Sequence, residues 1–470
     1  MVFSSNIFVF YFLPAVLLLY LLAELSNKMW LKNTVVLIAS LVFYAWGGVK
    51  YLLLLLGLVV INYVSGLLIY YTRYKKTFLT LGLMADVLNL LFFKYLNFII
   101  DNVESAVQHF GNAGFTFGLA QIALPIGISF FTFQIMSYLV DVYRNEVPAQ
   151  KNIAWLTLYI MMFPQLIAGP IVRYSDVNNE IACRKTTLDM VEKGIKRFII
   201  GFAKKVFIAN CMGAMADAVF AIKGEFNSLY AWLGAISYSM QIFFDFSAYS
   251  DMAIGLGLIF GFHFNENFEY PYISTSIQEF WRRWHISLST WFRDYVYIPL
   301  GGNRKGKIRT YINLSIVFLL TGIWHGAAWQ FIVWGLFHGL FMLVERAGLG
   351  KILKKIPAAF GHIYTLLIVV VGWVFFRADN LTKALAFLKN MFSFNFKQFT
   401  NEATVTQATH LFWVVGVIAI LASTPLFKKL GQTKLAQVKW IGYVGYLLLM
   451  IITVIYLSGL TYNPFIYFKF

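Results

Sequence analysis

Residues 311–345 read YINLSIVFLLTGIWHGAAWQFIVWGLFHGLFMLVE, which is two apolar runs separated by a short break. The runs cover 311–324 and 328–345, and His325 and Gly326 stand between them. A helix that crosses a bilayer needs about 20 mostly apolar residues, so both runs are short for full spans. Similar runs recur along the whole chain. They predict an all-α protein that crosses the membrane many times.

The overall composition supports the same prediction. Hydrophobic residues make up 60% of the 470 residues and charged residues 13%, with a mean hydropathy of +0.69. Soluble domains carry roughly 25% charged residues, and a soluble fold could not cover this much apolar surface. The net charge of +17 could indicate nucleic-acid binding. However, the Lys and Arg residues lie in the gaps between apolar runs, as cytoplasmic loops require. We therefore expect membrane lipid around the chain and no nucleic-acid partner.

Twelve apolar runs are candidate membrane spans. No soluble domain, internal repeat or low-complexity linker separates them, which predicts a single integral-membrane domain over 1–470. The first run has no basic residue before it and no small-residue cleavage site after it, so we expect it to be retained. The runs lie at 7–25, 33–47, 50–71, 77–100, 120–142, 195–222, 229–260, 311–324, 328–345, 361–376, 408–426 and 441–460.

The charged gaps predict an orientation. The amino-terminal MVFSSN is uncharged, the gaps at 26–32 and 72–77 are basic, and 101–114 has acidic residues without Lys or Arg. Because basic gaps stay in the cytoplasm, the amino terminus and 101–114 are predicted outside. By the same alternation the C-terminal tail is outside too. The other loops predicted inside are 261–309, 346–356 and 427–440.

Segment 152–172 breaks this alternation. The segment after it, 173–198, is also basic and would lie outside if 152–172 crossed fully. The core of the segment, FPQLIAGP at 163–170, contains two prolines and a glycine, which suit a broken helix. Irregular backbone is tolerated at membrane depth only where protein or a water-filled cavity satisfies its polar groups. We predict a re-entrant hairpin that lines a cavity, with an ordinary kinked span as the alternative.

His325 is the first candidate for chemistry, because polar residues inside apolar runs are costly and usually mark function. An imidazole with a near-neutral pKa can act as a general base for an alcohol or thioester reaction. Gly326 permits a hinge beside it. The alternative is a structural histidine hydrogen-bonded between helices, which its position alone favours. His338 shares a run with Trp334 and is interpreted as a packing residue.

The stretch FWRRWHIS at 280–287 is the second candidate. Trp and Arg at a membrane interface usually anchor a protein, and composition alone favours that role. The alternative is that Arg282 and Arg283, next to His285, bind the phosphates of a large anionic donor.

The stretch FDFSAYSD at 244–251 places Asp245 and Asp251 in apolar surroundings. Buried carboxylates need partners, and Arg282, Arg283 or Arg293 are the expected ones. A structural ion-pair network is the favoured role of this stretch. No Walker A loop, metal-ligand spacing or Gly-x-Ser-x-Gly elbow is present, and Cys183 and Cys211 form no disulfide framework. We expect no metal and no tightly bound cofactor.

Several stretches together resemble the membrane-bound O-acyltransferase (MBOAT) family, most nearly its bacterial members that acetylate alginate. The similarity covers nearly the whole chain and is highly specific. The stretches are FWRRWHISLSTWFRDYVYIPLGGNR (280–304), TGIWHGAAWQFIVWGLFHG (321–339), PIGISFFTFQIMSYLVDVYR (125–144), FPQLIAGPIVR (163–173), DFSAYSDMAIGLGLIFGFHFNENFEYPY (245–272) and GWVFFRA (372–378).

The resemblance implies a fold and a site. The fold would be a ring of about 11–13 transmembrane or re-entrant helices around a thinned centre with a tunnel. The histidine of the family's Trp-His-Gly motif maps onto His325 as the catalytic residue, and that of its Arg-Arg-Trp-His motif maps onto His285. Trp324, Arg282, Arg283, Asp245 and Asp251 are then candidates for lining the tunnel or holding the donor.

The implied reaction is acyl transfer, with acetyl-CoA or an acyl carrier protein as the cytoplasmic thioester donor. The acceptor would be an exported polysaccharide such as alginate, reached with a hydrolase-like acetyltransferase partner outside the bacterial inner membrane. D-alanyl or peptidoglycan acyl transfer by the same fold is an alternative. From the residues alone, a secondary transporter or an export scaffold also stays open, although a transporter should show an internal repeat.

The aromatic tail NPFIYFKF at 463–470 suggests one further role. Aromatic residues there can simply anchor the tail at the membrane interface. In the D-alanyl system a similar tail belongs to a small partner protein, and its Tyr is implicated as an acyl carrier. That resemblance suggests Tyr467 as an acyl relay, because a phenol with a pKa of about 10 forms a reactive aryl ester.

Overall fold

The computed structural model describes residues 1–111, 114–397, 401–433, 438–460 and 462–466, and these residues form helices and loops without a strand. The predicted all-α class is confirmed. The α-helices are α1 (Leu13–Leu25), α2 (Met29–Ala45), α3 (Val49–Tyr71), α4 (Lys75–Leu90), α5 (Leu96–His109), α6 (Ile128–Tyr143), α7 (Ile153–Met161), α8 (Phe163–Leu166), α9 (Tyr174–Ala182), α10 (Leu188–Ala203), α11 (Asn210–Phe220), α12 (Ser228–Ile259), α13 (Ile277–Arg283), α14 (Ile286–Phe292), α15 (Gly306–His325), α16 (Trp329–Val344), α17 (Gly350–Leu353), α18 (Ala358–Arg377), α19 (Leu381–Phe392), α20 (Glu402–Gln407), α21 (His410–Ala422), α22 (Leu426–Leu430) and α23 (Lys439–Ser458).

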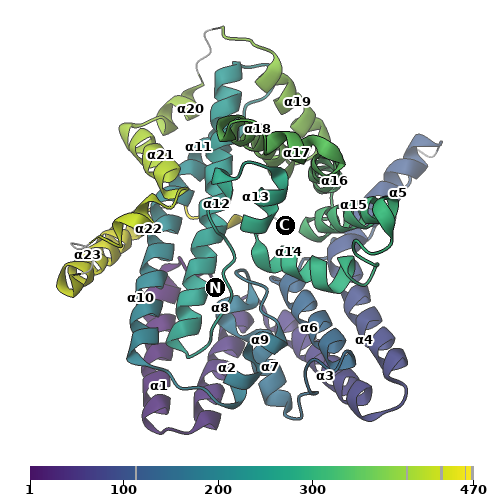
Figure 1. Cartoon of the computed structure of the whole chain (residues 1–470), viewed down its shortest axis with the longest axis vertical. Helices are drawn as coiled ribbons and strands as arrows, with labels where there is room; N and C mark the ends of the chain where they lie inside the picture. Colours follow the sequence, from purple (N-terminus) through teal and green to yellow (C-terminus); the bar gives the residue numbers. More distant parts are fainter. Residues whose placement is uncertain (112–113, 398–400, 434–437, 461, 467–470) are drawn as a thin grey trace.

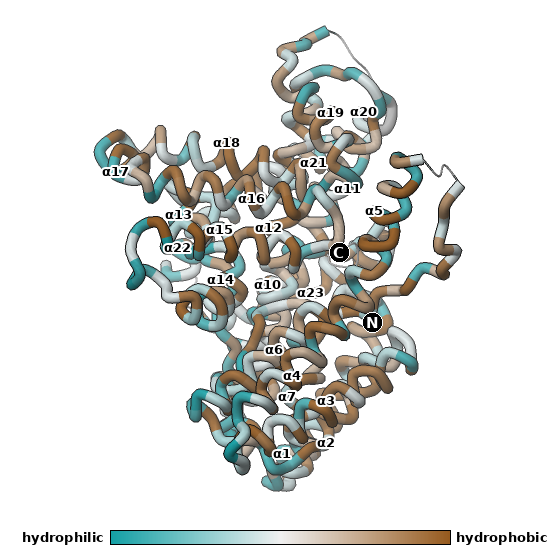
Figure 2. Tube along the Cα trace, turned by 90° about the vertical axis from the view of Figure 1, so that its right-hand side faces the viewer, coloured by the Kyte–Doolittle hydropathy of each residue, from teal (hydrophilic) through white to brown (hydrophobic). Residues whose placement is uncertain are grey.

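Within the described residues, eight helical stretches are long and apolar enough to cross a membrane, and they match eight of the twelve predicted spans. They confirm a polytopic membrane protein. In the 18-residue apolar part of the stretch over α4 and α5, only 17% of the residues are buried inside the protein, and in that of α23 only 11%. Figure 2 shows apolar residues along outer helices such as α3 and α5, with hydrophilic residues near the turns at the lower end. Such a surface suits contact with lipid.

The other four predicted spans lie on α2, α6, α15 and α21. Helices α2, α6 and α21 have 17, 16 and 13 residues, and α15 begins with the basic residues Lys307 and Arg309. The prediction of a helix from residue 120 is wrong, because α6 begins only at Ile128. Pro125 and Gly127, which has a φ of +78°, keep the preceding backbone out of the helix.

Helix α12 runs through the middle of the molecule (Figure 1). In its 18-residue apolar part, 89% of the residues are buried. Glycines set its approach to α10. A Cβ atom on Gly194 would lie 2.6 Å from the carbonyl oxygen of Gly255, and one on Gly201 would lie 2.6 Å from that of Ala248. Small residues at membrane helix crossings let backbones touch. This crossing therefore fixes the helix that carries Asp245 and Asp251.

A second glycine crossing joins α15 to α16. A Cβ atom on Gly322 would lie 2.5 Å from the Phe331 carbonyl oxygen, and one on Gly335 would clash with the Phe318 carbonyl oxygen. Any larger residue would push the two helices apart. The crossing therefore sets the C-terminal end of α15, where His325 lies, against α16.

The predicted re-entrant hairpin is confirmed. After the exposed first turn of α7, residues 156–172 are all buried. Gln150 Nε2 before the segment donates to Tyr174 Oη after it (2.8 Å), and Tyr159 Oη donates to the Val172 carbonyl (3.1 Å). The two ends therefore lie side by side, so the segment turns back instead of crossing.

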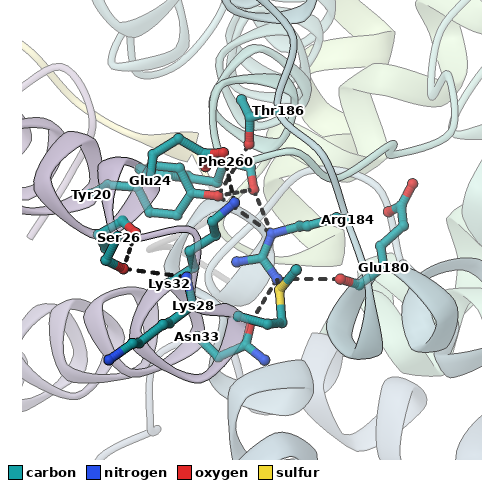
Figure 3. Close-up of polar contacts among 12 residues, drawn as sticks. Tyr20, Glu24, Ser26, Lys28, Lys32, Asn33, Glu180, Arg184, Thr186 and Phe260 are labelled. Carbon is teal, nitrogen blue, oxygen red and sulfur yellow. Dashed lines mark hydrogen bonds and ion pairs between the residues drawn. The ribbon is translucent and has the colours of Figure 1, made fainter.

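A buried polar cluster fastens the region where the basic gaps predicted to be cytoplasmic meet (Figure 3). Arg184 is 5% exposed and donates to the Phe260 carbonyl (2.8 Å) and to Asn33 Oδ1 (2.6 Å). Lys32 is 2% exposed and binds Glu24 at 2.6 Å. Burial of these cations is tolerated because Arg184 Nε and Nη1 and Lys32 Nζ find partners. The cluster connects α1, α2, the segment after α9 and the end of α12.

Candidate active site

His325 is the last residue of α15 and is 6% exposed. Its ring packs edge-on against Trp334 and Phe376, with ring centroids 4.9 and 5.1 Å away. The residue after it must be a glycine, because a Cβ atom on Gly326 would clash with the Phe331 ring. Among the described residues, no group hydrogen-bonds the buried His325 Nδ1. Aromatic packing therefore holds this imidazole.

A cavity of about 240 Å³ opens beside His325. Most of its wall is apolar, and its polar groups include the imidazole, the Ser129 hydroxyl and the Lys94 ammonium. A small apolar chamber with a few placed polar groups is typical of a small-molecule site. The cavity is lined by Lys94, residues 124–130, Ile167, Trp324 and His325.

His285 lies between α13 and α14 and is 1% exposed. Its φ of +44° is in the left-handed region, and such strain in a residue other than glycine is often stored at functional sites. Its Nδ1 lies 3.1 Å from Asn267 Oδ1, while Asn267 Nδ2 donates to Ser250 Oγ (3.1 Å). The His285 Nδ1 therefore carries the hydrogen. Within the described part of the chain, His285 Nε2 is buried without a partner, so its lone pair is free.

The re-entrant hairpin forms one wall around His285. Asn267 Nδ2 also donates to the Gly169 carbonyl (3.3 Å), and the Ile171 N–H donates to Ser287 Oγ (2.9 Å). Ser287 Oγ in turn donates to Asn267 Oδ1 (2.9 Å). The broken backbone of the hairpin thus finds the polar partners that membrane depth requires.

Trp324 packs against both histidines. Its ring centroid is 6.0 Å from that of His285 and 4.9 Å from that of His325. Its Nε1 donates to the Ser129 carbonyl (3.3 Å), and its ring packs on Phe130 at 5.4 Å. The fold therefore brings His285, Trp324 and His325 together, although 40 residues separate the histidines.

A second cavity, of about 420 Å³, is lined by Asn267 and Ile286, the hydrogen-bond partner and the chain neighbour of His285. Asp251 also lines it and pairs with Arg197 (3.0 Å) and Lys204 (2.8 Å). Arg197 lies in the basic segment 173–198, which is predicted to face the cytoplasm. His325 thus lines the first cavity, and His285 contacts residues that line the second.

The expected partners of the α12 carboxylates are wrong, although the predicted ion-pair network is present. Asp245 pairs with Lys205 at 2.8 Å, and both side chains are about 3% exposed or less. Lys205 lies on η3 (Lys204–Ala209), a π-helical turn that packs along α12. Asp245 and Asp251 therefore both pair with basic residues of the helical segments that pack along α12.

The arginines named as partners are engaged elsewhere or face outward. Arg283 binds Glu279 one turn before it (2.9 Å), and Arg293 binds the adjacent Asp294 (2.6 Å). Arg282 is exposed. Arg282 and Arg283 line a polar cavity of about 610 Å³, and its other charged lining residues are Lys351, Lys354, Glu269, Glu279 and Glu345. The structure does not bring these two arginines to His325.

His338 packs on aromatic rings, as predicted. It is fully buried, and its ring lies 5.3 Å from Trp281 and 5.2 Å from Trp334. Gly372 approaches so closely that a Cβ atom there would lie 2.6 Å from His338 Nε2. This histidine lies one helical turn from the wall that holds His325 and lines neither of the cavities beside the two histidines.

The last described residues of the chain fold back into the core. The Ile466 N–H donates to Asp245 Oδ2 (2.8 Å), and Lys205, the ion-pair partner of Asp245, donates to the Pro464 carbonyl. Phe465 and Ile466 are each 4% exposed. Asp245 and Lys205 therefore hold the tail.

Two further bonds fix the start of the tail. Tyr462 Oη donates to Asp217 Oδ2 (2.6 Å), and Asn463 Nδ2 donates to the Ser4 carbonyl (2.8 Å). The second bond places the two ends of the chain side by side, which agrees with the prediction that they share one side of the membrane. Tyr467 lies outside the described residues.

Three residues of this arrangement were missed from the sequence. Lys94, the one basic residue inside the run 77–100, carried a signal of its own, because a charge in an apolar span usually marks function. Lys205, inside the run 195–222, carried the same signal, whereas Asn267 carried none. Only the packing shows that Asn267 orients His285 and that Lys205 holds the tail.

Comparison with known proteins places this site in a family. The sequence profile of MBOAT, the membrane-bound O-acyltransferase family, matches residues 36–386. The chain is 44% identical to the probable alginate O-acetylase of Pseudomonas putida, over all of both chains. It is 35% identical to the peptidoglycan O-acetyltransferase of Helicobacter pylori, over all of this chain and 98% of that one. It is also 34% identical to the teichoic acid D-alanyltransferase of Bacillus subtilis, over 46% of this chain and 58% of that one.

The matched region contains α13 to α16, and with them both histidines and Trp324. The similarity to acetyltransferases extends over the full chain, tail included. The chain belongs to the membrane-bound O-acyltransferase family and is an acyltransferase enzyme of the membrane.

Proposed function

We propose that this enzyme takes an acetyl group from a cytoplasmic thioester and passes it through the membrane for O-acetylation of an exported polysaccharide such as alginate. The relatives with full-length similarity are named as alginate and peptidoglycan O-acetyltransferases, which favours acetyl over D-alanyl as the group transferred. A bacterial inner membrane and a hydrolase-like acetyltransferase partner on its outer side fit this reaction. The whole chain then acts as a single integral-membrane domain.

One observation carries the proposal: His285 and His325 both pack against Trp324, and each has a buried ring nitrogen that no described residue bonds. His325 lines one cavity, and Asn267, which binds His285, lines a second. In this proposal the thioester enters through the cavity lined by Asn267. The acceptor hydroxyl binds in the cavity lined by Ser129. A neutral imidazole in this position can act as a general base.

In the proposed step the acceptor oxygen attacks the thioester carbonyl carbon. His325 takes the hydroxyl proton as the new C–O bond forms, and the C–S bond then breaks. The imidazolium returns that proton to the departing thiolate, which leaves as a free thiol. His285 offers its Nε2 lone pair as a hydrogen-bond acceptor to that thiol, and Asn267 fixes its tautomer.

The donor is acetyl-CoA or an acetylated carrier protein. Exposed Arg282 with Lys351 and Lys354 around the polar cavity of about 610 Å³ suits the phosphates of either donor. Purified enzyme in liposomes, given each thioester with a radiolabelled acetyl group, should transfer label from one of them to an alginate oligosaccharide when the partner is present. Label from neither donor, or transfer of D-alanine instead, would overturn the acetyl assignment.

The proposed orientation has a direct test. In a chain without Cys183 and Cys211, Ser105→Cys should react with an impermeant maleimide from outside. Tyr74→Cys, Met190→Cys and Gln432→Cys should react only after the membrane is opened, because their basic gaps stay in the cytoplasm. Native Cys183, which is exposed, should behave as Met190→Cys does. If Met190→Cys is labelled from outside, the segment after the hairpin lies outside, and its proposed cytoplasmic location is wrong.

A further inference from the structure

Lys94 is a buried cation on η2 (Leu91–Tyr95), a π-helical turn between α4 and α5. It is 8% exposed and lies in a stretch apolar enough to span the membrane. A charge at such a place is costly and is usually retained for function. Within the described residues, no carboxylate lies within ion-pair distance of Lys94. Its ammonium donates instead to Ser129 Oγ (2.9 Å) and to two backbone carbonyls.

Those two carbonyls belong to the end of α15. Lys94 Nζ lies 2.5 Å from the Trp324 oxygen and 3.4 Å from the His325 oxygen. The next residue, Tyr95, donates its hydroxyl to the Ile323 oxygen (2.5 Å). Lys94 and Tyr95 thus bind three successive carbonyls of the last turn.

A helix leaves its last four carbonyls without internal partners, and they form the negative end of its dipole. Inside a membrane such groups must be satisfied by protein. At the end of α15, Trp324 and His325 are only 4% and 6% exposed, and the carbonyls of both accept hydrogen bonds from protein groups. A cation and a hydroxyl from the neighbouring turn therefore take the role that solvent has at a surface helix end.

The same contacts reach the wall of the small cavity. Lys94 binds the Ser129 hydroxyl, and Trp324 Nε1 binds the Ser129 carbonyl (3.3 Å). The turn at 94–95, the loop at Ser129 and the end of α15 are therefore linked, with Lys94 and His325 lining one cavity.

We infer that Lys94 and Tyr95 are positioning residues, which hold the last turn of α15 so that the His325 imidazole faces the acceptor. The inference rests on the proposed role of His325. Misplacement of a catalytic group by about 1 Å can cost about a hundredfold in rate. We call these contacts of Lys94 and Tyr95 with the last turn of α15 the clamp. Loss of the clamp should lower kcat and leave the KM for the thioester unchanged.

The test uses Lys94→Ala in the full enzyme, assayed with the thioester that supports transfer. We expect kcat to fall by about a hundredfold with KM within about twofold of the parent. Propylammonium matches the side-chain atoms that this substitution removes, and the adjacent cavity admits it. Propylammonium should raise the kcat of Lys94→Ala at least about tenfold. Tetramethylammonium, which has no N–H donor, should not raise it.

Lys32→Ala is the matched control, because Lys32 is an equally buried lysine in the polar cluster of Figure 3. It should lower the melting temperature without amine rescue and without loss of kcat per folded molecule. If Lys94→Ala does not fold, Tyr95→Phe tests the same clamp. It removes one hydrogen bond to Ile323 and should lower kcat about fivefold.

Wild-type kcat in folded Lys94→Ala, or equal effects of the two ammonium ions, would overturn the clamp. Wild-type kcat in Tyr95→Phe would do so where Lys94→Ala does not fold. In each of these cases an inactive His325→Gln enzyme would leave the proposed function standing. An active His325→Gln enzyme would instead remove the proposed function on which the clamp rests.

Discussion

Replacement of His325 by glutamine is expected to lower polymer acetylation by about a thousandfold, within the range that loss of a general base produces. Glutamine keeps much of the size and polarity of histidine but cannot take the hydroxyl proton. The ring lies among Trp334 and Phe376 with little exposure, so no bulk water replaces it. The measurement is the acetyl content of the polymer together with the amount of folded enzyme in the membrane. His325→Ala should be equally inactive.

His338→Gln is the matched control for this prediction. His338 is a second fully buried histidine on the adjacent helix, held by Trp281 and Trp334. Its substitution should lower stability, because Gly372 leaves no room for rearrangement, while kcat per folded molecule is kept. Normal acetylation by a stable His325→Gln enzyme would rule out His325 as the base, whatever the control shows.

The sequence predicted those features that depend on local pattern. Apolar runs of about 20 residues predicted the spans, and Pro164, Gly169 and Pro170 predicted the turning segment at 152–172. A lone imidazole between two runs singled out His325. In each case a few neighbouring residues carry the physical reason. That is why these predictions needed no knowledge of the packing.

The ion pairs could not be predicted in this way. Asp245 lies 40 residues after Lys205 in the chain, and the two meet only because α12 packs along η3. Among several basic residues, the sequence does not say which one a helix crossing brings close. Asn267 is a similar case, because an ordinary polar residue of a loop becomes the group that orients His285. The capping role of Lys94 depends on where α15 ends relative to η2.

Replacement of Tyr467 by phenylalanine is the prediction that decides what the tail does. We propose that Tyr467 accepts the acetyl group with His325 as base and passes it to the external partner. Phenylalanine keeps the ring and removes only the hydroxyl, so an anchoring role would survive and a relay would not. We expect polymer acetylation to fall below about a thousandth of the parent rate, as for loss of a covalent carrier.

The docking of the residues before Tyr467 supports this proposal. The Lys205–Asp245 pair binds the backbone at Pro464 and Ile466, and a surface anchor would not need two buried charges. An aryl ester is reactive enough to be handed on, because the phenol has a pKa of about 10.

The sharpest measurement is mass spectrometry of the C-terminal peptide after incubation with the thioester and without the partner. Parent enzyme should carry one hydroxylamine-sensitive acetyl group on that peptide, and Tyr467→Phe should carry none. Tyr462→Phe is the matched control, because it removes a tail hydroxyl that binds Asp217 (2.6 Å). It should loosen the tail, lowering the rate only about fivefold, as for loss of one hydrogen bond. Wild-type acetylation of the polymer by Tyr467→Phe would show that the tail serves only as an anchor, because no other atom differs between the two enzymes.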